Sequence, residues 1–452
     1  MRINSTVPIG AAIAVVSAVV AAAAGPRPQG VGAPAATSAV PTFSRDVAPI
    51  FYKHCVECHR PGEIAPMSLL TYKDARPWAR AIQTRVSDGV MPPWHADAQA
   101  GTFANERKLT TEEKNTIARW EAGGAPEGNP RDLPPAPTFA DGWQIGTPDA
   151  VFQMSEDYAV PPTGTIQYEY FYIPTNFTDR QWLQAIEVRP GNRKLVHHVL
   201  VYYQAPPDEP QAAPALRLDP EQNRTPSPLA RPTHPQQRGA RRLIATYAPG
   251  TSPQVFPAGT ALRLPPGGVI ELQMHYTANG TAGTDRTKVG MVFAKEPPAQ
   301  EIRASQFLNT RFTIPAGAAD HRVDAEVEFQ QDALLWGLFP HTHVRGKRWN
   351  YVLALPDGST KPLLSVPKYD FNWQTYYMFT KPLAIPKGAR ILSSAWYDNS
   401  TANKWNPDPK LDVQWGDQTW EEMQYTGLLY TVKTPAGSAS AAGTERGVAS
   451  SR

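Results

Sequence analysis

Both cysteines of the chain lie in one short motif, Cys55-Val56-Glu57-Cys58-His59. This is the C-x-x-C-H pattern of covalent haem attachment, because two thiols three positions apart on a helix can bond to the two vinyl groups of a haem. The adjacent His59 then supplies an imidazole to the iron. A zinc site would need more cysteines, and a redox C-x-x-C is typical of a βαβ context, which is not seen here. We therefore expect a covalently bound haem c.

Two downstream methionines are candidates for the second axial ligand of that iron. Met91 lies in the run GVMPPW, where the following proline keeps the chain out of a helix, and we expect its thioether to bind the haem iron. Met67 in APMSLL is the alternative. His54 and His95 lie nearby in the sequence, and we expect them at the surface or beside the ligands.

Five of the seven remaining histidines lie in apolar runs that are typical of strands. His341 and His343 in PHTHV are two residues apart, so on a strand both imidazoles project from one face and can share a metal ion. His197 and His198 in LVHHVLVYY are adjacent, so they would need a bulge or a strand end to share one. His275 lies in LQMHYTANG.

The order of the runs HHVLVYY, LQMHYTANG, PHTHVRGK and WGDQTWEEMQ resembles the copper type II, ascorbate-dependent monooxygenases. That family includes peptidylglycine α-hydroxylating monooxygenase and dopamine β-monooxygenase. The resemblance implies two antiparallel β-sandwich domains with one copper ion each. It assigns the copper that transfers electrons to three ligands: His197, His198 and His275.

The resemblance assigns the copper that activates dioxygen to His341, His343 and Met423, the methionine that ends the GDQTWEEM run. These three would be the catalytic residues. Imidazole binds both oxidation states of copper, whereas a thioether favours Cu(I), the state that reacts with dioxygen. Met274, which adjoins His275, is the alternative thioether.

The chain also departs from the family. Peptide-hydroxylating members carry an arginine two residues before the H-x-H pair, where this chain has Phe339, so peptide-glycine substrates are not expected. Arg345 and Lys347 follow the pair and are expected at a solvated strand end, with steering of an anionic substrate as the alternative. Four aromatic residues are expected in the cores, with a pocket as the alternative: Trp336, Phe339, Trp349 and Tyr425. His234 and His321 lie in polar segments and are expected at the surface.

The elements that must position these residues change character along the chain. Residues 43–128 have a helical pattern, with Ser44 and Thr110 as expected caps and Gly123 as an expected stop. This segment resembles class I cytochromes c, which implies a small all-α domain. Beyond it, short β-branched and aromatic runs broken by Pro and Gly indicate antiparallel sandwiches, and the length allows two.

We therefore predict a multidomain chain in which a small all-α cytochrome c domain precedes two all-β, jelly-roll-like sandwiches. The expected boundaries are a signal peptide at 1–24, a flexible linker at 25–41, the cytochrome c domain at 42–128, a proline-rich linker at 129–147, copper sandwiches at 148–297 and 298–432, and a disordered tail at 433–452. The 47 prolines and 32 glycines among 452 residues agree with short strands and turns rather than long helical bundles.

Export is indicated by the first 24 residues. Arg2 precedes the apolar run AAIAVVSAVVAAAA at 11–24, which is typical of a cleaved signal peptide and of a periplasmic or secreted protein. The run is shorter than the roughly 20 residues that a spanning helix needs, so no stable membrane span is expected, and a retained anchor is the alternative. A net charge of +3 gives no reason to expect a nucleic acid partner.

Together, these patterns predict an exported, haem-c-coupled dicopper monooxygenase that hydroxylates a C–H bond of a small organic substrate. Its partners would be dioxygen, that substrate, and an external electron donor, either an ascorbate-like reductant or a redox protein. A tethered haem would refill the copper ions at an effective concentration of about millimolar. The alternative is a non-enzymatic electron-transfer or copper-binding protein whose sandwiches dock a partner, and it predicts metal binding without oxygen consumption.

Overall fold

The computed structural model describes residues 39–97, 102–139, 142–207, 209, 215–222, 241–248 and 251–432. The chain divides into two compact units, 1–40 and 41–452, and every described helix and strand belongs to the second. The predicted signal peptide, most of the predicted linker at 25–41, the predicted tail and His234 lie outside the described residues.

The helices are short and lie in the first part of the described chain. They are η1 (Phe43–Val47), α1 (Ala48–His54), α2 (Tyr72–Ala75), η2 (Arg76–Trp78), α3 (Ala79–Ser87), α4 (Thr111–Ala122) and η4 (Pro130–Asp132). As expected, Thr110 caps α4: its hydroxyl accepts from the Glu113 amide, and the Glu113 carboxylate accepts in return from the Thr110 amide. The expected cap at Ser44 is wrong, because Thr42 precedes the first turn and Ser44 is buried within it.

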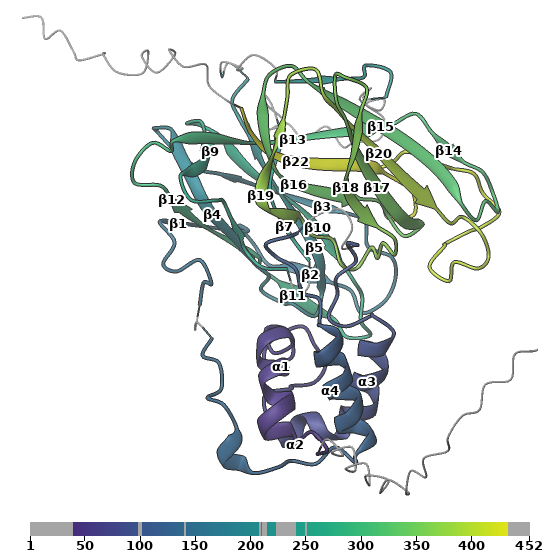
Figure 1. Cartoon of the computed structure of the whole chain (residues 1–452). Helices are drawn as coiled ribbons and strands as arrows, with labels where there is room; N and C mark the ends of the chain where they lie inside the picture. Colours follow the sequence, from purple (N-terminus) through teal and green to yellow (C-terminus); the bar gives the residue numbers. More distant parts are fainter. Residues whose placement is uncertain are drawn as a thin grey trace, which may run out of the picture. The chain divides into compact units, whose positions relative to one another are not determined.

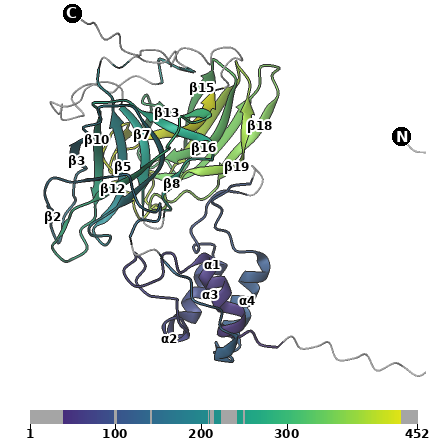
Figure 2. The ribbon, with the colours of Figure 1, turned by 90° about the vertical axis from the view of Figure 1, so that its left-hand side faces the viewer.

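A small aromatic core holds these helices together. Phe43, Phe51 and Trp120 are fully buried, with ring centroids 6.1 to 6.2 Å apart. Helices α3 and α4 pack side by side (Figures 1 and 2). No helix in the described parts of the chain has the length and apolar character needed to cross a membrane.

One long sheet runs through the β-rich part, with the strand order β1-β12-β4-β9-β13-β22-β16-β19 and with β8 paired to β4. Its strands are β1 (Ala150–Gln153), β4 (Gln181–Arg189), β8 (Gln254–Val255), β9 (Thr260–Leu264), β12 (Lys288–Phe293), β13 (Gln300–Asn309), β16 (Ala333–His341), β19 (Tyr377–Ile385) and β22 (Gln424–Val432). The pairs are antiparallel except β9 with β13, which runs parallel and carries the sheet across the predicted 297/298 boundary.

Two smaller sheets face the long one. The first has the order β3-β10-β5-β7 and consists of β3 (Glu169–Pro174), β5 (Val196–Gln204), β7 (Arg241–Tyr247) and β10 (Val269–Tyr276). The second has the order β18-β17-β20-β15-β6 and consists of β6 (Leu216–Leu218), β15 (His321–Phe329), β17 (Gly346–Ala354), β18 (Thr360–Val366) and β20 (Arg390–Tyr397). Two further pairs are β2 (Tyr158–Val160) with β11 (Gly283–Asp285), and β14 (Thr313–Ile314) with β21 (Val413–Gln414).

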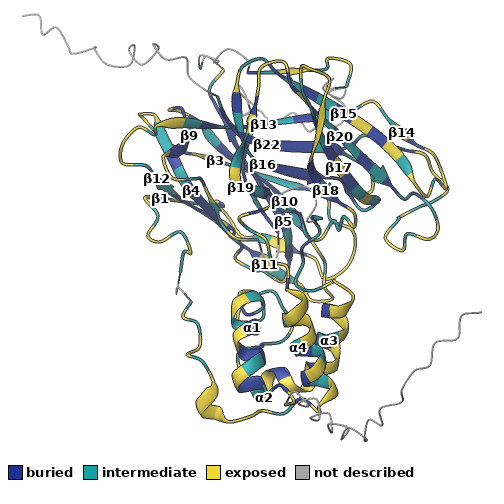
Figure 3. Cartoon of the chain, in the orientation of Figure 1, coloured by how far each residue is buried: buried dark blue, intermediate teal, exposed yellow. Residues whose placement is uncertain are grey.

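Each smaller sheet shares its own apolar core with the long sheet. Leu272 and Val201 of the four-stranded sheet belong to one core, together with Ile186 of β4. Trp349 of the five-stranded sheet belongs to the other, together with Leu428 of β22. Figure 3 shows the buried residues that line these layers. The expectation of a β-rich, multi-sheet fold after a helical part is confirmed at this level.

One stretch within residues 42–128 packs on the β-rich part. Trp94 and Phe103 belong to the core of the five-stranded sheet, and Phe103 forms a β-bridge with Phe379 of β19. The Ala104 amide donates to the Met378 carbonyl at 2.7 Å. The chain therefore leaves the helices after α3, adds to a sheet edge, and returns to form α4.

Candidate metal centres

Two neighbouring strands, β5 and β10, bring three histidines together. In their antiparallel register His198 lies opposite His275, and the next pair is Val196 with Tyr276. His197 is therefore an extra residue on β5, a bulge of the kind that two adjacent histidines need in order to face one ligand. We call His197, His198 and His275 the three-histidine group.

The imidazole nitrogens of this group converge. One ligand atom from each of the three lies within 4.8 Å of the others. His198 Nδ1 is 3.1 Å from His197 Nδ1 and 3.4 Å from His275 Nδ1. A nitrogen of a neutral imidazole either donates one proton or accepts one, so His198 Nδ1 cannot make a hydrogen bond to both neighbours. Separations near 3 Å are those expected for nitrogens that each lie about 2 Å from one shared metal ion.

The protonation of the three-histidine group suits a metal ion. Burial lowers the pKa of His198 well below its usual 6.5, and the neighbouring imidazoles lower it further. Burial likewise lowers the pKa of His275 to about 3. His197 Nε2 lies 2.9 Å from Asn372 Oδ1, an oxygen that only accepts, so this nitrogen carries the proton and Nδ1 keeps its lone pair. Neutral imidazoles with free lone pairs are the form that binds a metal.

His341 and His343 lie at the end of β16. The strand ends at His341, and Thr342 to Gly346 form a turn in which the Gly346 amide donates to the His343 carbonyl. His341 and His343 therefore do not lie on one regular strand, which corrects the expectation from their i, i+2 spacing. The two rings nevertheless come together, with centroids 5.2 Å apart at 84°.

Each of these two rings is held through Nδ1. His341 Nδ1 donates to Gln374 Oε1 at 2.6 Å, and His343 Nδ1 donates to the Glu421 carbonyl at 3.1 Å. Their Nε2 atoms therefore keep the lone pairs. His343 Nε2 is buried and has no hydrogen-bond partner within the described part of the chain. A buried nitrogen without a partner is costly, which fits a place for a metal ion. Burial also lowers the pKa of His341 to about 4.

Met423 lies beside this pair by register. β22 begins at Gln424, and its Tyr425 is the partner of His341 across the antiparallel ladder. Met423 precedes Tyr425 by two residues, and His343 follows His341 by two, so both lie past the same end of the paired strands. Coordination by the Met423 sulfur stays a prediction. Met274 is fully buried in an apolar core.

Glu422 links the turn of His343 to the segment that immediately precedes β22. Its buried carboxylate accepts from the His343 amide at 2.8 Å and from the Arg345 amide at 2.7 Å. Burial raises the pKa of Glu422 to about 7, although these donors oppose the shift. Sequence reasoning gave this residue no role, although the acidic pair before Met423 was a visible signal.

The expectation of a solvated Arg345 is wrong. Its side chain is 2% exposed and donates to Asn399 Oδ1 and to the Trp420 carbonyl, both at 2.9 Å. Lys347 is exposed as expected and pairs with Asp320 at 3.0 Å. The two cations differ because the turn directs one into the protein and the other to its surface.

The predicted haem motif follows α1. Cys55 and Cys58 are half-buried unpaired thiols, and the amides of Cys58 and His59 both donate to the Cys55 carbonyl, at 3.1 and 2.9 Å. Burial raises the pKa of Cys55 to about 12. His59 Nδ1 donates to the Met67 carbonyl at 3.3 Å, which leaves His59 Nε2 available for an iron.

The three other residues singled out near the motif, His54, His95 and Met91, have different surroundings. His54 Nε2 contacts the Glu113 carboxylate at 3.1 Å, so it links α1 to the cap of α4. His95 is half-buried, and burial lowers its pKa. Met91 lies in the turn after α3, with its amide bonded to the Arg85 carbonyl at 3.1 Å. Its role as an iron ligand stays a prediction.

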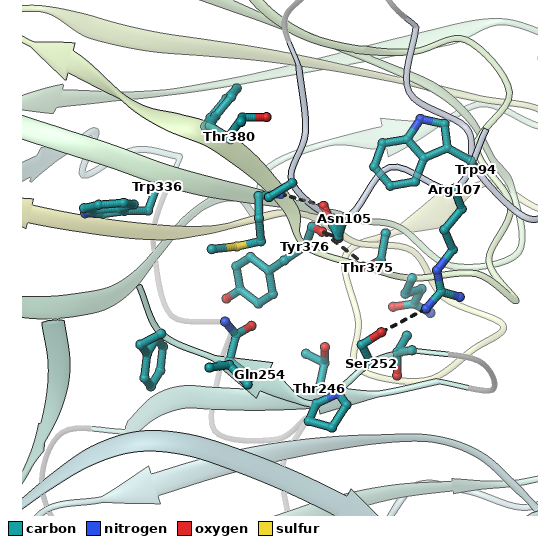
Figure 4. A pocket seen from close by; sticks show the side chains of 18 of the residues that line it. Trp94, Asn105, Arg107, Thr246, Ser252, Gln254, Trp336, Thr375, Tyr376 and Thr380 are labelled. Carbon is teal, nitrogen blue, oxygen red and sulfur yellow. Dashed lines mark hydrogen bonds between the residues drawn. The ribbon is translucent and has the colours of Figure 1, made fainter. Parts of the chain in front are cut away.

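A pocket of about 460 Å³ lies next to Gln374, the residue that holds His341. Figure 4 shows Trp336, Tyr376 and Trp94 on its apolar walls, with Gln254 and Thr246 among its polar groups. Of the four aromatic residues singled out in the sequence, Trp336 lines this pocket. Phe339 and Trp349 are buried in the cores, and Tyr425 packs beside His341 with ring centroids 5.9 Å apart.

No protein-family model matches the sequence, and no curated protein matches it. Among solved structures, the major capsid protein P2 of bacteriophage PM2 has a TM-score of 0.27 at 9% sequence identity, over 63% of this chain and 98% of that chain. Allantoicase from Saccharomyces cerevisiae has a TM-score of 0.18 at 6% identity, over 61% of this chain and 80% of that chain. Likenesses this weak identify neither a family nor an activity, so the functional assignment rests on the histidine groups themselves.

Proposed function

We propose that this protein is an exported, haem-c-coupled dicopper monooxygenase that hydroxylates a C–H bond of a small organic molecule. The observation that carries the proposal is the presence of two histidine groups, one buried and one partly buried, with ring nitrogens that face one another or have no partner. In one, a ligand nitrogen from each of three histidines lies within 4.8 Å of the others. In the other, His343 offers a buried Nε2 without a partner among the described residues. The finer fold assignment, a cytochrome c domain followed by two copper sandwiches, belongs to the same proposal.

The two groups lie close to one another. The Tyr168 ring contacts His198, His275 and His343, at centroid distances of 5.6, 5.0 and 6.3 Å. Tyr168 is itself buried, and its hydroxyl lies 3.3 Å from Thr419 Oγ1. If each group held a copper ion, electrons would therefore have a short path between the two ions.

The overall reaction needs electrons from outside. Hydroxylation of R–H by dioxygen consumes two electrons and two protons and yields R–OH and water. When bound, copper supplies one-electron redox chemistry and a place for dioxygen, and haem supplies a one-electron relay. An external donor, an ascorbate-like reductant or a redox protein, must deliver both electrons.

The chain's own residues would hold and orient the copper ions and the haem. Asn372 and Gln374 hold the protons of His197 and His341 on Nε2 and Nδ1, so the other nitrogen of each ring would be free to bind an ion. Glu422 holds the turn that carries His343. The His341 and His343 side chains are at most 4% exposed, so this site excludes bulk water. Cys55, Cys58 and His59 would hold the haem, together with Met91.

Metal content and oxygen consumption test the proposal. Purified full-length protein should contain one iron and two copper ions per chain, and it should consume dioxygen with a reduced donor and a panel of organic substrates. A matched control is His321→Ala, which removes a histidine outside both groups and should retain both copper ions. Metal binding without oxygen consumption would instead indicate the electron-transfer or copper-binding protein. Absence of copper in the wild type would overturn both.

A further inference from the structure

The loop at 367–376, between β18 and β19, contacts both histidine groups. Its backbone is anchored at Tyr369, whose amide donates to the Lys347 carbonyl at 2.9 Å. The Tyr369 hydroxyl donates to the Thr342 carbonyl at 2.9 Å and accepts from the Thr342 amide at 3.2 Å. Thr342 lies between His341 and His343. The loop is therefore tied to the turn that carries the second group.

Phe371 in this loop packs against imidazoles from both groups. Its ring lies over His197 at 5.4 Å and 28°, and it meets His198 edge to face at 5.6 Å. Its centroid is 6.1 Å from that of His275 and 6.0 Å from that of His343. One apolar ring thus contacts four of the five histidines and helps to keep water away from them.

The two amide side chains of the loop have only one orientation that satisfies their neighbours. Asn372 Nδ2 donates to Asp370 Oδ1 at 2.8 Å, so Asn372 Oδ1 faces His197 Nε2. Gln374 Nε2 donates to the Phe371 carbonyl at 3.0 Å, so Gln374 Oε1 faces His341 Nδ1. Exchanging N and O in either amide would set two donors or two acceptors against each other.

The consequence differs between the two groups. An amide oxygen can only accept, so the proton of His197 must lie on Nε2 and that of His341 on Nδ1. The free lone pairs are then on Nδ1 of His197, which faces His198 Nδ1 at 3.1 Å, and on Nε2 of His341. The same loop selects opposite tautomers in the two groups.

We propose that the 367–376 loop positions a histidine in each of the two groups. It leaves the free lone pair of His197 on Nδ1 and that of His341 on Nε2, so that each nitrogen can bind a metal ion. That these tautomers serve metal binding rests on the proposed function, whereas the tautomers themselves are a property of the metal-free protein. Hydrogen-bond partners of metal-binding histidines typically change metal affinity 10–100-fold when they are removed.

The first test uses metal-free, full-length protein labelled with ¹⁵N-histidine and records two-bond ¹H–¹⁵N correlations, which identify each tautomer. Asn372→Leu and Gln374→Met keep side-chain size but remove the acceptor. Each should mix the tautomers of its own partner, His197 or His341, and leave the other unchanged. Wild-type tautomers in both variants would overturn the proposal.

Acceptor-retaining variants separate positioning from folding. The exchange Asp370→Asn with Asn372→Asp swaps donor and acceptor and keeps an oxygen towards His197, and Gln374→Glu keeps one towards His341. Both should preserve the wild-type tautomers, even if the acceptor-free variants lose stability. Failure of both acceptor-retaining variants to preserve them would also overturn the proposal.

The second measurement is Cu(I) affinity by competition with a chromogenic chelator. Asn372→Leu and Gln374→Met should each lower the Cu(I) affinity of one of the two sites by about 10-fold or more. The affinities of the acceptor-retaining variants should stay within about threefold of the wild-type values. Affinities unchanged within twofold in the acceptor-free variants would contradict a role in metal binding. If wild-type protein bound no copper, the proposed function would fail, and the tautomer measurement would still decide the role of the loop.

Discussion

The two histidine groups are built from the same side chain in different backbone settings. The three-histidine group lies on two paired strands, where a bulge at His197 lets neighbouring residues face one point through Nδ1. The other group lies where β16 ends, and a turn fastened by Glu422 presents its rings through Nε2. The backbone and the neighbouring acceptors, rather than the residue type, therefore decide which nitrogen a histidine offers.

The two groups also differ in how far the ligand set is closed. Three side chains converge in the first, and His197 and His275 are only partly buried. In the second, two buried imidazoles come together, and the register brings Met423, the predicted third ligand, to the same end of the paired strands. A group closed by three imidazoles suits electron storage, and one completed by a thioether suits Cu(I).

Removal of one predicted ligand from either group should have the largest effect on activity. Met423→Ala and His198→Ala should each abolish oxygen consumption, because hydroxylation needs both ions. Each should also lower copper from two to one per chain while leaving the haem spectrum unchanged. Metal analysis and oxygen uptake check this, and full activity in Met423→Ala would refute the assigned roles.

A second prediction concerns Glu422, which has no counterpart in the three-histidine group. Glu422→Ala leaves the buried amides of His343 and Arg345 without their acceptor, so stability should fall by about 2–4 kcal/mol. Urea unfolding measures the change. Glu422→Gln, which keeps one accepting oxygen, should lose less. Equal losses in the two variants would mean that the carboxylate does not act as the acceptor for this turn.

Acid should destabilise the metal-free protein through both groups. The folded-state pKa values of His275 and His341 are lowered to about 3 and about 4, below the ordinary 6.5. As the pH falls below 6.5, these histidines become protonated in the unfolded chain but stay neutral in the folded chain. The free energy of unfolding therefore decreases until the pH reaches the folded-state pKa. The limiting loss for His341 is about 3 kcal/mol.

Paired denaturation curves isolate this contribution. Metal-free wild type and His341→Gln should be compared at pH 7 and pH 4.5, and the variant should lose less stability between the two. The difference removes the effect of carboxylates that titrate in both proteins. An identical pH dependence would show that His341 is not held neutral.

The smallest effect should come from the exposed cation beyond the second group. Lys347→Ala breaks a surface ion pair with Asp320 and should change stability by less than about 1 kcal/mol. Arg345→Ala, two residues away, removes buried hydrogen bonds to Asn399 and Trp420 and should cost more. Thermal unfolding of the two variants measures the contrast, and similar costs would count against the buried setting of Arg345.

Several features of this protein follow from the sequence alone. The C-x-x-C-H motif predicts haem attachment from sequence because the spacing of two thiols and an imidazole is a local property. Alternating apolar and β-branched runs predict strands for the same reason, and the cap at Thr110 needs only four residues. Adjacent histidines in a strand also predict a bulge, if both are to face one ligand.

Other features depend on residues that meet only in the folded chain. Asn372 is 175 residues from His197, and Gln374 is 33 from His341, so no local pattern indicates that one loop serves both. The inward course of Arg345 follows from Glu422 and Asn399, which the turn brings to it. The amino-acid sequence sets which side chains are available as candidate metal ligands. Which nitrogen each imidazole offers depends on the folded chain, because hydrogen-bond partners and burial set its protonation.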